Sequence, residues 1–237
     1  MVPLSKALAG GRGTSFRPRI SLIIDDIGFS LCRARQFLDL AVPVTYAVLP
    51  RLSHSHALAR EIHAEGHEVM LHQPMEPFNA SLDPGPGALY VGDEAGIIVK
   101  TIEENISEVP FATGVNNHMG SKFTACPKEI QAALQVVKNS GLFFVDSLTS
   151  SRSMAYKTAR ELHLDTACRN IFLDNRADIP SILSQLHRLR RHAARYGQAI
   201  GIGHPFPETA GAIRYFLKGL SDSEISFVHV SDLVLSA

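Results

Sequence analysis

The chain has 237 residues and a mass of 25.8 kDa, which suits one large α/β domain or two small ones. Apolar residues make up 45% and charged residues 19%, and this composition excludes disordered, collagenous and coiled-coil proteins. Lysine plus arginine and aspartate plus glutamate each number 23, so no excess positive charge favours nucleic acid as a partner. Apolar runs such as residues 20–24 and 142–145 are far shorter than the roughly 20 residues of a membrane helix, so no membrane span is expected.

The three cysteines and the first 19 residues say little about function. Cys32, Cys126 and Cys168 are odd in number and far apart, which predicts small buried side chains rather than disulfides or a thiolate zinc site. Residues 1–19 contain three glycines and several basic residues but no apolar segment of a signal peptide, which predicts a flexible arm. The same stretch is equally compatible with the remnant of a longer precursor.

From residue 20 onward, short apolar runs alternate with longer stretches of helical periodicity, which predicts repeated βα units. The expected strands cover residues 20–24, 42–49, 68–71, 113–118, 142–145, 171–173, 199–203 and 225–230. The expected helices cover residues 31–40, 54–64 after an N-cap at Ser53, 93–109, 127–140, 153–162, 180–196 and 208–220. Seven or eight such units without a linker in residues 20–237 favour one α/β barrel domain, although an open doubly wound sheet has a similar local pattern.

Polar residues able to bind a ligand recur at the carboxyl ends of the predicted strands. They are Asp25 and Asp26, His72, Asn117 and His118, Asp146, Asp174, and His204. In both α/β architectures these strand ends converge on one face, where active sites form. Each residue alone is weak evidence, because an aspartate there often caps the next helix and a histidine often serves only a hydrogen bond. Their recurrence in six units favours a shared site.

The residue types at these strand ends suit a divalent cation. Side chains alternate along a strand, so one of Asp25 and Asp26 can bind a cation while the other stays free as a base. His72 and Glu76 offer an imidazole and a carboxylate on a proline-stiffened loop, a chelate for a borderline metal. Alternatively, His118 completes a set of Asp26, His72 and His118 with an open position for an activated water.

Six segments together resemble the divergent polysaccharide deacetylase family, in the expected order and over nearly the whole chain after residue 19. They read LIIDDIG at 22–28, GHEVMLHQPMEP at 66–77, GVNNHMGSKFT at 114–124, GLFFVDSLTS at 141–150, FLDN at 172–175 and IGIGHPFPET at 200–209. The resemblance implies a distorted seven-stranded βα barrel and a location in the bacterial cell envelope or periplasm. It also implies that Asp25 is the catalytic base, that Asp26 and His72 bind the metal, and that His204 is the general acid.

The chain departs from the superfamily pattern at two places. Glu76 stands where the superfamily has a second metal-binding histidine, and the Arg-x-Pro-Tyr motif is missing, with NNHMGS at 116–121 in its part of the chain. Because imidazole suits zinc better than a second carboxylate, we predict the ligand set Asp26, His72 and His118. Glu76 is then expected to orient the site or to contact the substrate, a role that Asn117, Asp146 and Asp174 could share.

The strand-end residues predict a metal-dependent hydrolase with zinc as the expected cation and a metal-activated water. The family resemblance implies that it removes acetyl groups from an N-acetylated sugar polymer. Two alternatives stay open. Glu76 and the missing motif motivate a non-catalytic barrel that binds a glycan or an envelope protein. A glycosidase would need two carboxylates roughly 5 to 9.5 Å apart, for which Asp146 and Asp174 are the candidates.

Overall fold

The computed structural model describes residues 17–221 and 225–234, and its strands and helices alternate along most of the chain. The strands are β1 (Arg19–Ile27), β2 (Thr45–Val48), β3 (Glu68–Met75), β4 (Ala112–Met119), β5 (Phe143–Asp146), β6 (Thr166–Cys168), β7 (Ile171–Phe172), β8 (Gln198–Gly203) and β9 (Ser226–Phe227). The helices are α1 (Leu31–Leu38), α2 (Ser55–Ala64), α3 (Ala95–Glu108), α4 (Pro127–Asn139), α5 (Ala155–Glu161), α6 (Ile179–Tyr196) and α7 (Pro207–Lys218), with 3-10 turns η1 (Phe123–Ala125) and η2 (Val230–Leu233).

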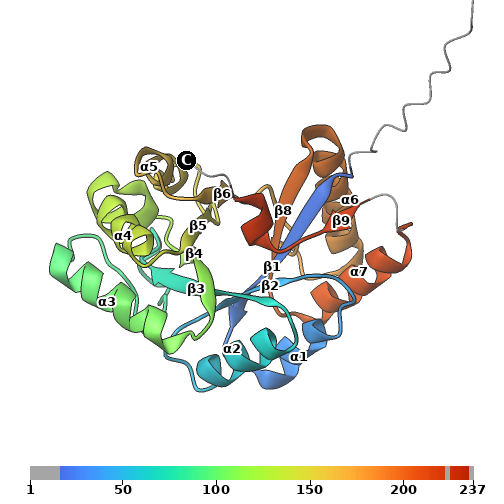
Figure 1. The fold of residues 1–237 in the computed structure, drawn as a ribbon, viewed down its shortest axis with the longest axis horizontal. Helices are drawn as coiled ribbons and strands as arrows, with labels where there is room; N and C mark the ends of the chain where they lie inside the picture. Colours follow the sequence, from blue (N-terminus) through green and yellow to red (C-terminus); the bar gives the residue numbers. More distant parts are fainter. Residues whose placement is uncertain (1–16, 222–224, 235–237) are drawn as a thin grey trace, which may run out of the picture.

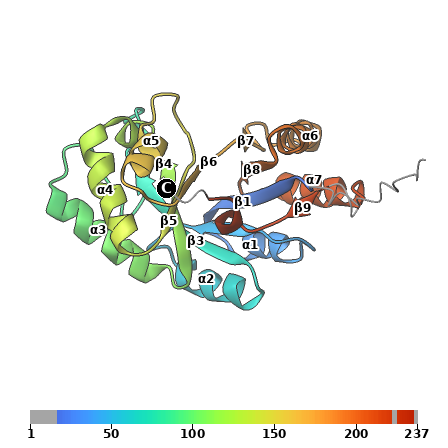
Figure 2. The same cartoon turned by 45° about the horizontal axis from the view of Figure 1, so that its top comes forward.

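The strands form one sheet in the order β6-β5-β4-β3-β2-β1-β8-β7, and β9 pairs with β1. The pairings between these strands are all parallel. The sheet curls into a half-barrel whose outer side carries the helices (Figure 1, Figure 2). The prediction of one α/β barrel of seven or eight strands is therefore confirmed.

The half-barrel is open between β6 and β7, because the described residues contain no pairing between these two edge strands. The chain itself crosses this gap through Arg169 and Asn170. The N–H of Arg169 donates to the carbonyl of Asp146 in β5 at 3.0 Å, and that of Asn170 donates to the carbonyl of Ile200 in β8 at 2.9 Å. This crossing brings Arg169 to the mouth between the two sides of the sheet.

The hydrophobic core has two parts, one between the sheet and the helices and one inside the curled sheet. The inner part includes Ile23, Met70 and Ile202, and η2 adds Val230 and Leu233 to it. The buried carboxylate of Glu68, at the amino end of β3, accepts hydrogen bonds from the backbone N–H groups of Val230 at 3.0 Å and Ser231 at 3.3 Å. The chain therefore closes the amino end of the half-barrel and leaves the carboxyl end for a site.

Most predicted elements exist, with shifted ends and a few errors. Helix α2 begins at Ser55 without a side-chain cap, so Ser53 is not the N-cap that we expected. Strand β6 was missed because three residues give no measurable periodicity, and the expected last strand is short because η2 starts at Val230. Cys32 is exposed and the other two cysteines are half-buried, so the expectation of buried cysteines was wrong.

Two further expectations concern the ends and the helices of the chain. Residues 1–16 of the predicted arm lie outside the described residues, whereas Arg19 already belongs to β1. Across residues 17–221 and 225–234, none of the helices combines the length and the apolar character that crossing a membrane requires.

Candidate metal centre and active site

Three side chains from three strands of the sheet converge at its carboxyl end. Asp26 comes from β1, His72 from β3 and His118 from β4, and one ligand atom from each lies within 4.8 Å of the others. Asp26 Oδ1 is 2.9 Å from His118 Nδ1 and 3.2 Å from His72 Nε2, and the two imidazole nitrogens are 3.1 Å apart. The structure thus brings together the ligand set that the sequence predicts.

The chemistry of these three atoms fits a divalent cation. Asp26 Oδ1 is buried without a hydrogen bond of acceptable geometry, although both imidazole nitrogens lie close to it. A buried acceptor of this kind is costly to leave unmatched in a folded protein. Two imidazoles and one carboxylate are also the donor types that zinc prefers when one coordination position stays open. We conclude that Asp26, His72 and His118 could hold zinc or a similar cation.

Asp25 lies beside this centre on the same side of β1. Its Oδ2 atom is 3.7 Å from His72 Nε2, so both adjacent aspartates face the same imidazole. The predicted alternation of Asp25 and Asp26 is therefore wrong, and the backbone gives the reason. Asp26 has a φ of 58°, a left-handed conformation, and the pairing with β2 shifts register between Ile24 and Ile27.

Asn116 links Asp25 to His72 of the candidate metal centre. Its side-chain N–H donates to Asp25 Oδ1 at 2.8 Å, and its Oδ1 lies 2.7 Å from His72 Nδ1, which therefore donates the bond. This contact fixes the tautomer of His72 and leaves Nε2 free to face the cation. All three of these residues are buried. Asn117 was the residue expected at this place, although period-two alternation from His118 along β4 indicates Asn116.

Across the mouth, His204 pairs with Asp174. The imidazole Nδ1 donates to Asp174 Oδ1 at 2.8 Å, and the backbone N–H of His204 donates to Oδ2 at 2.6 Å. The hydroxyl of Thr209, in α7, also donates to Oδ2 at 2.8 Å. Asp174 is thus an orienting residue whose two oxygens are both used within the protein.

Burial and charge shift the acidity of these groups in opposite directions. Burial raises the pKa of Asp25, against the opposing influence of His72 and His204. Burial lowers the pKa of His204, but the hydrogen bond and charge of Asp174 and the charges of Asp25 and Asp26 outweigh it and raise this pKa to about 9. His204 is therefore protonated at neutral pH, as a proton donor requires.

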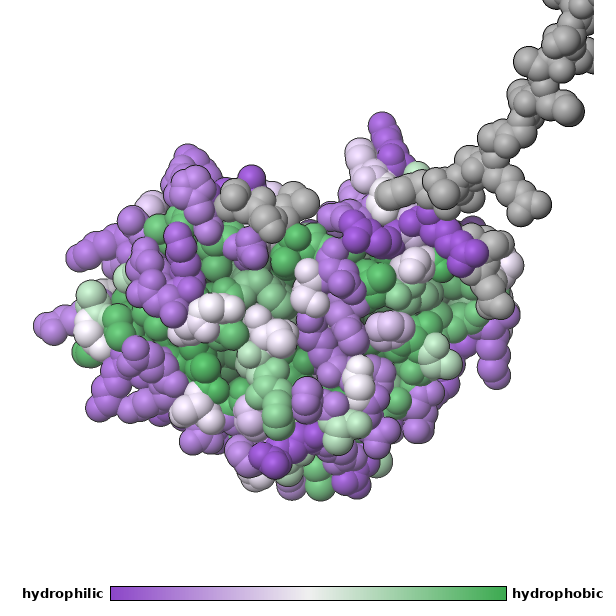
Figure 3. Space-filling view, viewed as in Figure 1, coloured by the Kyte–Doolittle hydropathy of each residue, from purple (hydrophilic) through white to green (hydrophobic). Residues whose placement is uncertain are grey.

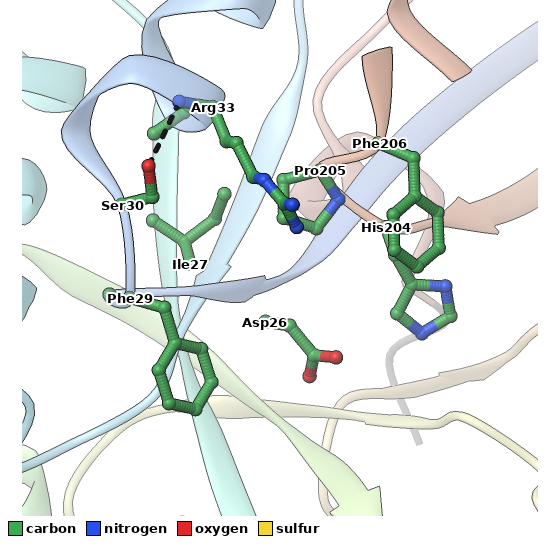
Figure 4. Close-up of a pocket in the computed structure, with 10 residues that line it drawn as sticks. Asp26, Ile27, Phe29, Ser30, Arg33, His204, Pro205 and Phe206 are labelled. Atoms are coloured by element: carbon green, nitrogen blue, oxygen red, sulfur yellow. Dashed lines mark hydrogen bonds between the residues drawn. The ribbon is translucent and has the colours of Figure 1, made fainter. Parts of the chain in front are cut away.

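A pocket of about 410 Å³ opens beside Asp26 and His204, and Figure 4 shows the side chains around it. Its walls are formed by residues 26–30 at the carboxyl end of β1, by the first turn of α1, and by Pro205 and Phe206 after β8. Its volume lies within the roughly 300 to 1,000 Å³ typical of small-molecule sites. A substrate group in this pocket would lie next to both the candidate metal centre and His204.

The chain was compared with known protein families, and residues 22–234 match the model of the divergent polysaccharide deacetylases. The chain belongs to this family. Among its relatives is the uncharacterized protein YibQ of Escherichia coli (strain K12), which is 32% identical over 217 residues that cover 91% of this chain and 67% of YibQ.

Several solved structures have the same fold as this chain. An uncharacterized protein of Agrobacterium tumefaciens C58 is 28% identical, with a TM-score of 0.88 over 96% of this chain and 92% of that one. The catalytic domain of a peptidoglycan N-acetylglucosamine deacetylase from Eubacterium rectale has a TM-score of 0.56 at 11% identity, over 95% of this chain and 92% of that one. A CE4 family pseudoenzyme from Bacillus anthracis has a TM-score of 0.53 at 14% identity, over 92% of this chain and 65% of that one. The last two likenesses concern the fold alone.

In this member of the divergent polysaccharide deacetylase family, Glu76 is not among the three candidate ligands. Its Oε1 accepts a 2.6 Å hydrogen bond from Lys122, and its Oε2 accepts one from the backbone N–H of Val91 at 2.9 Å. The N–H groups of Lys122 and Phe123 donate to its carbonyl. Glu76 therefore links the loop after β3 to the loop after β4, and its expected role in orienting the site or contacting substrate stays a prediction.

The side chains of two other strand-end residues form hydrogen bonds within the loops and not with the candidate metal ligands. The side chain of Asn117 donates to the carbonyl of Met119 and accepts from the N–H of Ser147. Asp146 is fully buried and accepts hydrogen bonds from the N–H groups of Leu148 and Tyr156 and from the hydroxyl of Ser153. The carboxylates of Asp146 and Asp174 are thus occupied, which removes the pair that the glycosidase alternative required.

Arg169, which follows the short strand β6, was not among the residues expected at the site. Its guanidinium donates to the carbonyls of Ser147 at 2.6 Å and Leu148 at 2.9 Å and lies 3.7 Å from the ring centroid of Phe172. Phe172 in turn stacks against His204, with centroids 6.2 Å apart. Burial lowers the pKa of Arg169, while Cys168, Asp146 and Asp25 act in the opposite direction. No periodic signal marked this residue, because its strand has only three residues.

Proposed function

We propose that the chain is a metal-dependent hydrolase that removes the acetyl group from an N-acetylated glycan. The observation that carries this proposal is the joint presence, at one mouth, of a three-ligand centre, a buried carboxylate and a protonated imidazole. The reaction breaks the amide C–N bond, adds water to the acyl carbon and gives acetate and an amine. Membership of the divergent polysaccharide deacetylase family supports the same reaction class.

Asp26, His72 and His118 would hold the cation. When bound, a divalent cation such as zinc would polarise the amide carbonyl and make water more acidic. The protein contributes a fixed geometry, because Asn116 holds His72 in one tautomer and β3 and β4 pair in register beneath both histidines. Zinc is the cation that two imidazoles and one carboxylate favour.

Asp25 is the proposed general base. It is buried, its Oδ1 is held by Asn116 at 2.8 Å, and its Oδ2 is directed toward the metal centre. Burial raises its pKa, which brings the carboxylate closer to the acidity that suits proton transfer near neutral pH. In the proposed step, Asp25 accepts a proton from the attacking water.

His204 is the proposed general acid. Asp174 orients the imidazole through Nδ1, so Nε2 is the atom left to donate a proton to the departing nitrogen. With a pKa of about 9, this histidine carries the proton when the reaction begins at neutral pH. Asp25 and His204 thus have separate tasks, set by burial for the first and by Asp174 for the second.

The test measures acetate release from a panel of N-acetylated oligosaccharides, with and without added zinc, for the wild type and Asp25→Asn. We expect zinc-dependent release by the wild type and a loss of about a hundredfold or more in the variant, as is typical when a general base is removed. Zinc content serves as the control and should stay stoichiometric in Asp25→Asn. Glycan binding without acetate release under every metal tested would contradict the proposal.

That contrary outcome would support a second candidate, a non-catalytic barrel that binds a glycan or an envelope protein. Two observations favour keeping it. Glu76 stands at the position of a second metal-binding histidine and is engaged by Lys122, and a CE4 family pseudoenzyme shares the fold. A fold alone does not guarantee an activity.

The family resemblance also leads us to propose that the protein works in the bacterial cell envelope or periplasm. Localisation of the full-length protein by cell fractionation tests this, and recovery only in the cytoplasmic fraction would contradict it.

A further inference from the structure

The pocket beside the candidate metal centre has one wall that the proposed reaction does not use. This wall is the first turn of α1, and it contributes Arg33 to the pocket lining. In Figure 4 the Arg33 side chain extends from α1 toward the opposite wall, where Pro205 and His204 lie. A guanidinium therefore borders the same space as Asp26 and His204.

The contacts within the protein do not explain why Arg33 is at this position. Among residues 17–221 and 225–234, the structure gives its guanidinium no ion pair or hydrogen bond, and only its backbone N–H is bonded, to the Ser30 hydroxyl at 3.4 Å. A positive charge in the first turn of a helix also opposes the helix dipole. By contrast, Arg35, one position beyond the first turn, forms a two-bond contact with Glu61 at 2.7 and 3.0 Å.

The remaining walls are suited to a sugar ring. Phe29, 66% exposed, and Phe206 present aromatic surface to the pocket, and Pro205 adds another apolar side. Pockets that bind small molecules combine such apolar walls with a few polar groups that set orientation and specificity. Here the polar groups are Asp26 and His204 at the reacting end and Arg33 at the other wall.

We propose that Arg33 is a specificity-determining residue that recognises an anionic group, a carboxylate or a phosphate, on the N-acetylated saccharide. Arginine suits this task because its charge is permanent and its planar donors match both kinds of oxyanion. The acetamide would lie toward Asp26 and His204 while the anion meets Arg33 across the pocket. This inference rests on the proposed function, since it assigns the substrate class to the same site.

Binding measurements test the inference independently of turnover. The probes are N-acetylglucosamine, N-acetylmuramic acid, which adds a carboxylate, and N-acetylglucosamine 6-phosphate. NMR titrations give the dissociation constant of each for the wild type, Arg33→Gln and Arg35→Gln. The last variant removes the same charge from the same helix but outside the pocket, and thermal unfolding verifies that each variant is folded.

We expect the wild type to bind at least one anionic probe about tenfold more tightly than N-acetylglucosamine, and Arg33→Gln to lose this preference. Arg35→Gln should keep it, and the neutral probe should bind all three proteins alike. Preference for the carboxylate or for the phosphate identifies which anion the site takes. Equal binding of all three probes by the wild type, or a preference that survives in Arg33→Gln, would overturn the inference. Neither result depends on acetate release, so a failure of the proposed reaction is recognised separately.

Discussion

Two groups of histidine and aspartate residues lie at the mouth of the half-barrel, and they differ in how their hydrogen bonds are satisfied. In the first group, Asp26 Oδ1 is buried with two imidazole nitrogens within 3.2 Å and no hydrogen bond of acceptable geometry. In the second, both oxygens of Asp174 are used, by His204 and Thr209. The first arrangement is suited to a cation and the second to a proton.

The position of each group in the sheet explains this difference. Asp26 belongs to β1, the strand between β2 and β8, and its φ of 58° turns the carboxylate toward the histidines of β3 and β4. Asp174 follows the edge strand β7, beside β8 and the start of α7, where N–H and O–H donors are available. The strained backbone is found in the group that lacks donors, as is common where function sets the geometry.

The largest effect is expected on zinc binding, when one candidate ligand of the first group is removed. Asp26→Ala and His72→Ala should each abolish stoichiometric zinc in the purified protein, because two remaining ligands cannot hold the cation tightly. Elemental analysis checks this. His67→Ala is the matched control, since His67 is a partly buried histidine outside the centre and its loss should leave the zinc content unchanged. Unchanged zinc in both ligand variants would show that the ligand assignment is wrong.

A second comparison tests whether the third ligand is His118, as the strand geometry indicates, or Glu76, as the spacing of the superfamily motif would suggest. His118→Ala should weaken zinc binding by more than about a hundredfold, beyond what loss of an outer contact produces, because His118 Nδ1 lies at the centre. Glu76→Ala should change zinc affinity by less than about tenfold and act mainly on stability, because Glu76 binds Lys122. A zinc titration with a competing chelator measures both. The reverse ranking would mean that position 76 supplies the ligand.

A smaller effect is expected on the pH dependence of the free energy of unfolding, through His204 of the second group. His204 has a pKa of about 9 in the folded chain and about 6.5 when unfolded, so its proton favours folding. The contribution is complete below about pH 6.5 and is lost as the pH rises through 9. Urea unfolding of the metal-free protein should therefore show a loss on the order of 3 kcal/mol over this range. His204→Gln should lack that component, and an identical pH dependence in the variant would refute this account.

The sequence could predict the barrel and the ligand set, since parallel strands place their carboxyl ends on one face and strand ends are visible as polar breaks after apolar runs. It could not predict that Asp25 and Asp26 face the same side, because a local left-handed residue overrides the alternation of the strand. The sequence also could not predict the ion pair that holds Glu76. Its partner Lys122 lies 46 positions away in another loop, and no local pattern encodes that contact.

Arg169 and Arg33 illustrate two further limits of sequence reasoning. Arg169 reaches the mouth only because the chain crosses the open seam between β6 and β7, a topological detail that short strands conceal. Arg33 resembles any solvent-exposed helix residue in the sequence, and its place in the pocket follows from the direction of α1 relative to the segment after β8. Both residues become informative only when the packing of distant segments is known.

Anomalous X-ray diffraction from zinc-soaked crystals tests the central claim most directly. The account predicts one strong zinc peak between Asp26 Oδ1, His72 Nε2 and His118 Nδ1, at bond lengths of about 2.0 to 2.2 Å from each. A zinc ion bound by Glu76 would contradict it. So would a zinc-soaked crystal in which zinc binds elsewhere and no peak lies between these three atoms.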